Sequence, residues 1–235
     1  MIEQWIAVNF SPELAAQLAD LATDLANAFG ETFLMVGIST LFAIVGGLPL
    51  GFLLHVTSRK LFWNNRLANV AGNFLVNVLR SIPFVILLVL LLPLTQWVLG
   101  TTIGPTAAAV PLSVAAIAFY ARLVEASLCE VDPGVVEAAE AFGTSPLRII
   151  ATVLFPEALP GFLRGLTVTL ISLIGYSAMA GIVGGGGIGD LAIRFGYYRY
   201  QTNVMIVTVV VLVVLVQAVQ SFGDLLARRA DRKDG

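Results

Sequence analysis

The chain has 235 residues, of which 58% are hydrophobic and only 12% carry a charge, and its formal net charge is −2. Soluble domains carry about 25% charged residues, so roughly half of the expected water-facing surface is missing and an ordinary soluble protein is excluded. The low pI of 5.4 and the mean hydropathy of +0.91 also argue against a nucleic-acid-binding protein, which needs a concentrated basic patch.

The first predicted element is an external amphipathic helix within residues 1–31. Ser11 supplies a capping hydroxyl and Pro12 takes the first helical position. An apolar stripe then recurs at helical spacing, formed by Leu14, Leu18, Leu21 and Leu25. We expect this helix to lie on the membrane surface or on neighbouring helices, ahead of the first membrane span.

Five apolar segments follow that are long enough to cross a bilayer, since a helix needs about 20 apolar residues to span roughly 30 Å of hydrocarbon. They cover residues 32–55, 74–99, 101–121, 165–183 and 204–222. None alternates like a barrel strand, and backbone polar groups in lipid must be satisfied within each segment. We therefore expect an all-α integral membrane protein with five transmembrane helices, in a single domain over residues 1–235.

Basic residues flank these predicted spans unevenly. Ten of the 13 Lys and Arg residues lie after the first span, between the third and fourth, or after the fifth, and only two lie on the other side. The positive-inside rule then places the N-terminus outside and the C-terminus in the cytoplasm. Residues 122–164 become a cytoplasmic coupling region, and residues 223–235 become a cytoplasmic tail.

The coupling region contains a polar helix–turn–helix. Asp132 and Pro133 have the residue types of a helix start, and Gly143 is placed to end that helix in the left-handed conformation. Pro156 and Pro160 are expected to interrupt the chain before the fourth span. The predicted product is a short, rigid, exposed helix between two membrane spans.

This stretch resembles the signature loop of ABC importer permeases, in which Glu-Ala-Ala, three residues, Gly and nine residues precede Ile-x-Leu-Pro. The chain has Glu137-Ala138-Ala139, Gly143 and Val153-Leu154-Phe155-Pro156 at the same spacing, with Val for Ile and Phe for Leu. The resemblance implies a coupling helix that docks in a groove of a separate ATPase subunit. It assigns ATPase coupling to Glu137, Ala138, Ala139, Gly143 and Pro156. An ordinary charged connecting loop is the alternative interpretation.

Further segments are similar to methionine importer permeases, namely residues 77–84, 120–125, 156–161 and 175–181, within a resemblance that covers roughly 30–225. It implies an ABC importer type I permease fold, a homodimer in the bacterial inner membrane, and import of D- or L-methionine by alternating access. It also implies two copies of an ATPase subunit, which binds ATP and Mg²⁺, and an external substrate-binding lipoprotein. Neither catalysis nor a cofactor is expected in this chain.

Three alternatives remain open at this point. One is a permease of the same type for another amino acid or small solute. A secondary transporter is a second, although it should carry intramembrane acids and the predicted spans contain no Asp or Glu. A non-transporting membrane scaffold is the third.

Several residues in or next to the predicted spans are candidate interface, gate or pathway residues. Arg80 lies in the second predicted span, where a central Arg disfavours insertion by about 2.5–3.5 kcal/mol. We interpret Arg80 and Arg122 as interface or anchor residues, with a pathway role as the alternative for Arg80. Met179, in a run of small residues, is a candidate gate, and Ser177 and Tyr176 are candidate pathway residues; ordinary packing is the alternative.

Two segments are expected on the external side. The glycine-rich run 184–189 lacks the Lys-Ser/Thr of a phosphate-binding loop and is expected to form a hinge or a tight helix contact. Residues 194–200, rich in Tyr and Arg, form either an interfacial aromatic belt or a docking surface for the substrate-binding protein.

Overall fold

The computed structural model describes residues 12–58, 63 and 65–231, with side chains from residue 21 onward. The elements are α2 (Pro12–Phe42), η1 (Ala43–Gly47), α3 (Leu48–Val56), α4 (Arg66–Ser81), α5 (Phe84–Leu90), α6 (Leu92–Leu99), α7 (Pro105–Cys129), α8 (Pro133–Ala141), α9 (Pro146–Ile149), η2 (Ile150–Leu154), α10 (Phe155–Ala180), η3 (Gly181–Val183), α11 (Ile188–Leu191), η4 (Ala192–Tyr197) and α12 (Thr202–Ala230). The described part of the chain is all-helical, as predicted.

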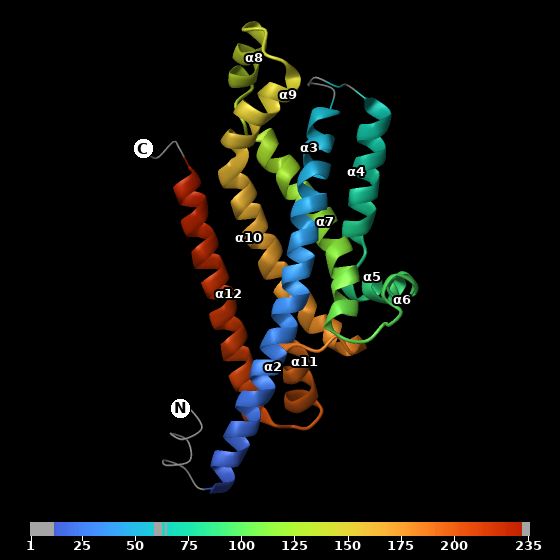
Figure 1. Ribbon diagram of the computed structural model, residues 1–235, viewed down its shortest axis with the longest axis vertical. Coiled ribbons are helices and arrows are strands. Elements are labelled where there is room, and N and C mark those ends of the chain that lie inside the picture. The colour runs from blue at the N-terminus through green and yellow to red at the C-terminus, as the bar shows by residue number, and fades with distance from the viewer. Residues whose placement is uncertain (1–11, 59–62, 64, 232–235) are drawn as a thin grey trace.

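Figure 1 shows an elongated bundle in which the axes of the long helices are roughly aligned, with α10 running opposite to α2, α7 and α12. The short helices α8 and α9 project from one end, which we call the elbow end. The segment around α11 lies toward the opposite end, which we call the loop end, and the first turns of α2 project beyond it. Helix α2 begins at the loop end, and α12 runs back toward the elbow end.

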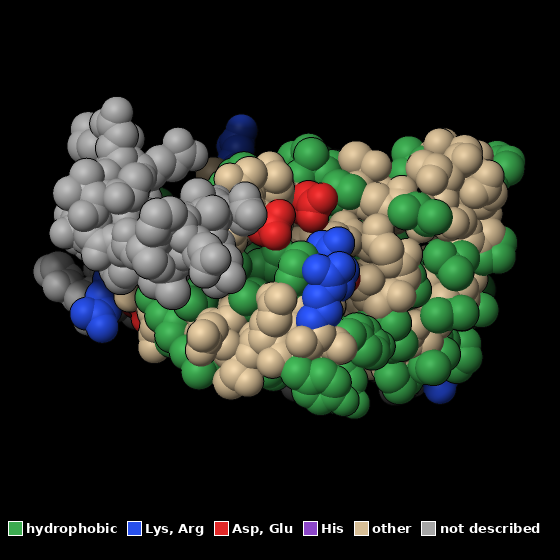
Figure 2. Space-filling view, turned by 90° about the horizontal axis from the view of Figure 1, so that it is seen from below, with side chains coloured by type: hydrophobic (Ala, Val, Ile, Leu, Met, Phe, Trp, Pro, Cys, Tyr) green, Lys and Arg blue, Asp and Glu red, His purple; other side chains and the backbone are tan. Residues whose placement is uncertain are grey.

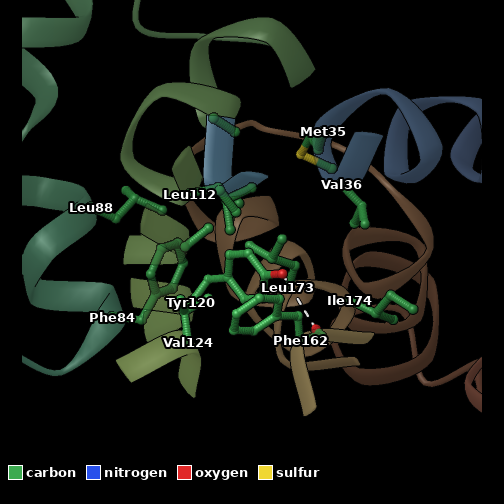
Figure 3. Packing of buried hydrophobic residues seen from close by; sticks show 14 of the residues in the cluster. Met35, Val36, Phe84, Leu88, Leu112, Tyr120, Val124, Phe162, Leu173 and Ile174 are labelled. Atoms are coloured by element: carbon green, nitrogen blue, oxygen red, sulfur yellow. Dashed lines mark hydrogen bonds between the residues drawn. The ribbon is translucent and has the colours of Figure 1, made fainter. Parts of the chain in front are cut away.

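Helix α7 lies at the centre of the bundle and packs against α2, α3, α4 and α10. Its inward side chains, together with those of α2 and α10, form the main hydrophobic core. Figure 3 shows Tyr120 of α7 within this core, where its hydroxyl donates a hydrogen bond to the Phe162 carbonyl at 3.3 Å. This bond satisfies a polar group among apolar neighbours and fixes α7 against α10.

Four helical stretches are long and apolar enough to cross a membrane: 21–56, 105–129, 146–183 and 202–230. A fifth crossing exists if the bent pair α4 and α5 counts as one span. The single helix predicted over residues 74–99 is wrong, because the chain turns by 105° between α4 and α5. The cause is Pro83, which forces Ile82 into an extended conformation at φ −82° and ψ 124°.

The expected boundary between an N-terminal surface helix and the first span is also absent. Helix α2 continues without a break from Pro12 to Phe42, since no proline or left-handed residue stands between them. The segment 12–31 is therefore the first part of the long helix in this structure. Residues 1–11 of that predicted helix, and residues 232–235 of the predicted tail, lie outside the described residues.

The two prolines before the fourth predicted span do not interrupt it. Residues 146–183 form one continuous helical stretch, with the π-helical turn η2 immediately before Phe155. Pro156 lies in the first turn of α10, where its missing N–H costs least, and Pro160 lies inside the helix. The elbow is consequently joined to α10 by an unbroken helical connection.

Candidate functional site

The elbow (residues 132–149) begins as the sequence predicts. Asp132 is the N-cap of α8, and its carboxylate accepts a hydrogen bond from the Gly134 N–H at 2.8 Å. Pro133 takes the first helical position, where a proline needs no hydrogen-bond partner. The start of α8 is thus fixed locally, without help from the bundle.

Gly143 ends α8 in the left-handed conformation, with φ +73°. The Gly143 N–H donates to the Glu140 carbonyl at 2.8 Å, and the Thr144 N–H donates to the Ala139 carbonyl at 3.2 Å. These two bonds define a Schellman motif, which satisfies carbonyls that the helix end leaves open. The predicted role of Gly143 as a helix terminator is therefore confirmed.

The surface of the elbow is open to a partner. No residue of α8 is buried, and Glu137 and Ala138 are exposed. Phe142, directly after α8, is 89% exposed and therefore almost uncovered by this chain, and Val135 is 43% exposed. Glu137 forms no ion pair with any described residue. An exposed Phe at the end of α8 is a suitable contact group for another protein.

Arg122 connects two helices near the elbow end. Its Nη1 forms an ion pair with Glu125 on α7 and donates to Asn73 Oδ1 of α4 at 3.0 Å. Asn69 extends the polar contacts of α4 by donating to the Leu54 carbonyl of α3 at 2.7 Å. Arg122 therefore ties α4 to the central helix, which is an interface within the chain.

The three residues predicted to line a pathway lie on α10 but face different ways. Ser177 is buried, and its hydroxyl donates to the Ile174 carbonyl at 2.8 Å. Tyr176 stacks on Phe84 of α5 with ring centroids 4.7 Å apart. Met179 is 42% exposed, one helical turn from Tyr176 and on the same side of α10. The structure thus groups Met179 with Tyr176 and separates Ser177 from both.

Arg80 lies in the last turn of α4, directly before the 105° bend. It lines a half-open cavity of about 120 Å³, together with Phe84, Phe119 and Tyr176. The Arg80 guanidinium carbon lies 5.9 Å from the centroid of the Phe119 ring, within cation–π range. Phe84 and Phe119 were not predicted to be site residues, because the bend that brings them to Arg80 has no counterpart in the predicted straight span over residues 74–99.

At the loop end, the glycine-rich run is held by the start of the first span. The Gly187 N–H donates to Glu31 Oε2 at 2.7 Å, and the Ile188 N–H donates to Thr32 Oγ1 at 2.9 Å. These amides are the groups that a phosphate-binding loop would offer to its ligand, and here protein oxygens occupy them. Of the two predicted roles, this geometry supports a tight contact.

Charged side chains gather near the middle of the loop end, among hydrophobic ones (Figure 2). Arg194 forms an ion pair with Asp190 at 3.0 Å. Burial raises the pKa of Asp190, an effect that the Arg194 guanidinium opposes and the Glu31 carboxylate reinforces. Arg194 and Arg199 both stack on the Phe195 ring, while the neighbouring tyrosines, Tyr197, Tyr198 and Tyr200, are exposed.

Residues 47–232 match the family described as binding-protein-dependent transport system inner membrane components. This segment contains the elbow, α10 and the bent pair α4–α5. The chain belongs to this family. It is a multi-pass permease of the inner membrane, as the apolar helices also indicate.

Relatives of the permease match over nearly their full length. It is 48% identical to the probable D-methionine transport system permease protein MetI of Vibrio cholerae, over 99% of this chain and 98% of that one. It is 45% identical to the methionine import system permease protein MetP of Bacillus subtilis, over 90% of this chain and 95% of that one. Its fold is similar to a chain in the inward-facing MetNI methionine ABC transporter, with a TM-score of 0.86 and 45% identity over 88% of this chain and 96% of that one.

Proposed function

We propose that this permease is the membrane-spanning subunit of an ATP-driven importer of methionine, working as a homodimer by alternating access. The single observation that carries the mechanism is the exposed elbow, which is locally rigid and joined without a break to α10. The methionine substrate is supported by relatives at 45% and 48% identity whose names contain methionine transport. A permease of this type for another amino acid is the closest alternative.

The elbow end would face the cytoplasm. Ten basic residues fall on the elbow side of the predicted spans and two on the other side, which supports this orientation through the positive-inside rule. The described chain begins at the loop end and finishes toward the elbow end, as an odd number of crossings requires. The N-terminus would then be outside and the C-terminus inside.

Docking to an ATPase subunit would use the outer surface of α8. Phe142 would enter an apolar groove, and Glu137 would pair with a basic residue of the ATPase. Ala138 and Ala139 are small enough to let the partner approach the helix backbone. Gly143 would hold the turn in shape, and Pro156 would start α10 close behind it. ATP and Mg²⁺ would be bound by the two ATPase copies, so hydrolysis is assigned to them.

The substrate pathway would lie between two copies of the permease. Met179 is exposed on α10 and flexible, which suits a gate that closes against its counterpart on the two-fold axis. Tyr176 would line the pathway on the same side of α10. Ser177 is buried, which supports a packing role better than a pathway role.

In this cycle, ATP binding would draw the two elbows together and tilt α10, opening the loop end toward the outside. An external lipoprotein would deliver methionine there. The exposed tyrosines of residues 194–200 are suited to docking that protein, since Tyr is enriched in protein interfaces. Release of the hydrolysis products would return the pathway to the cytoplasmic side.

The test is reconstitution of the permease in lipid vesicles with its ATPase and a substrate-binding lipoprotein, followed by uptake of labelled methionine. We expect uptake of methionine that requires ATP and both partner proteins. Other amino acids in excess should not inhibit this uptake. Uptake without the ATPase would identify a secondary transporter instead. A complex that hydrolyses ATP but accumulates no solute would indicate a scaffold, and preferential uptake of another amino acid would reassign the substrate.

A further inference from the structure

Arg80 lies in the last turn of α4, at the end of that helix away from the elbow. Helix α4 begins at the elbow end with Arg66, and Arg80 comes 14 residues later. At 1.5 Å per residue this is ~21 Å along the helix, compared with a hydrocarbon thickness of roughly 30 Å. The flexible stem of an Arg side chain is shorter than that distance, so Arg80 would not reach by snorkelling a membrane boundary placed at Arg66. Arg80 is exposed on the single chain, so its guanidinium is open to a ligand or to a second copy of the permease.

This charge has no acidic partner. Arg80 takes part in none of the ion pairs among the described residues, and none of the residues lining its cavity is an Asp or Glu. Within the described part of the chain, its guanidinium faces the Phe119 ring. Arg122, by contrast, is matched by Glu125 and Asn73. An Arg within a membrane-spanning segment normally has a functional role, and α4 belongs to the bent pair that can count as one span.

The surroundings of Arg80 fit an anion attached to an apolar group. The cavity of about 120 Å³ is far larger than the roughly 10–15 Å³ that a single water needs. Its walls include the stacked rings of Phe84 and Tyr176 beside the Phe119 ring. A guanidinium binds a carboxylate through two parallel hydrogen bonds, and aromatic rings attract a thioether sulfur. These are the two ends of an amino acid with a sulfur-containing side chain.

The cavity also adjoins the surface assigned to the pathway. Tyr176 lines the cavity, and Met179 lies one turn further along the same side of α10. Resting on the proposed function, we propose that Arg80, with Phe84, Phe119 and Tyr176, forms a transient intramembrane binding site for the carboxylate of the transported amino acid. Because the cavity is half open and small, the site holds the substrate during passage and does not replace the external binding protein.

The experiment compares two substrates in vesicles that contain the complete transporter. Methionine carries the carboxylate, and methioninol has the same side chain and amine with an alcohol in its place. Both are supplied at concentrations that saturate the binding protein, so that delivery is the same for every variant. We expect Arg80→Gln to lower methionine uptake about tenfold, the size of effect that follows from loss of a charge-assisted hydrogen bond. The same variant should lower methioninol uptake less than twofold.

Two further variants control for folding and general charge effects. Arg80→Lys keeps the positive charge but loses the two-pronged geometry, so it should show a smaller loss that is still selective for methionine. Arg66→Gln, on the same helix at the elbow end, should leave the ratio of the two uptake rates unchanged.

An equal loss of both substrates in the Arg80 variants would overturn the proposal, because it indicates a structural role or a bound lipid phosphate. Normal uptake of both substrates would overturn it as well. A wild-type transporter that shows no ATP-dependent uptake would instead refute the proposed function. The two failures are therefore distinguishable.

Discussion

Gly143 offers a direct test of whether the shape of the elbow turn matters for coupling. A Cβ added at this position would meet no atom within 4 Å, yet the residue has φ +73°. A substitution therefore introduces backbone strain without a steric clash in this chain. A left-handed conformation costs a non-glycine residue roughly 1–2 kcal/mol, which corresponds to a factor of about 5–30 in an equilibrium.

The series Gly143→Asn, Gly143→Ala and Gly143→Val separates conformation from size. Asn tolerates the left-handed region, Ala does so poorly, and a β-branched residue is a genuine outlier there. We expect the affinity for the ATPase, and uptake driven by ATP, to fall in the order Asn, Ala, Val, with Val weaker than the native residue by about tenfold or more. Binding is measured by titration of the ATPase onto permease in nanodiscs, and uptake in vesicles.

The matched control is Gly37→Ala, because Gly37 also has open space around its Cβ position but adopts an ordinary helical φ. This change should leave ATPase binding unaltered. If Asn and Val weaken binding equally, side-chain volume at the docking surface is responsible and the conformational explanation fails. If all three variants bind normally, the turn has no part in coupling.

Three other substitutions have distinct expected outcomes. Phe142→Ala should weaken ATPase binding by about 1.5–3 kcal/mol, the value of burying a Phe side chain, while thermal unfolding of the permease alone stays unchanged because Phe142 is 89% exposed; an altered unfolding temperature would show that Phe142 stabilises the fold. Met179→Ala should raise substrate-independent leak across vesicles, and an unchanged leak would remove Met179 as a gate. Gly189→Ala should destabilise the protein by about 1–3 kcal/mol through overpacking, since its Cβ would lie 2.1 Å from Ala178 Cβ. Thermal unfolding in detergent measures this, and a loss no larger than that of Gly37→Ala would contradict the packing at the loop end.

The elbow was predictable because its determinants are local. Asp132, Pro133 and Gly143 act within a few residues of themselves, through a cap, a fixed φ and a left-handed turn. Hydropathy likewise located the long apolar helices. The observed helices 105–129 and 202–230 nevertheless extend beyond the predicted segments 101–121 and 204–222. Polar residues in the last turns are tolerated at the membrane boundary, so hydropathy underestimates helix length.

The remaining features depend on contacts between distant residues or on competing local rules. The break at Ile82-Pro83 had a sequence signal, the restriction that proline places on the preceding residue, but the continuous apolar run obscured it. Pro156 gave the opposite error, because the π-helical turn before it accommodates a residue that usually ends a helix. The stacking of Phe84 on Tyr176 arises only after α5 has folded back against α10.

The unbroken stretch from Pro146 to Val183 has a geometrical consequence for transport. Its 38 residues correspond to a rod of ~57 Å at the α-helical rise. Rotation of such a rod by about 10° around its midpoint displaces each tip by about 5 Å in opposite directions. Met179 lies near one tip and the elbow adjoins the other. A small displacement of the elbow end of this helical stretch can therefore move its Met179 end toward or away from the proposed second copy of the permease. No helix has to unwind for this movement.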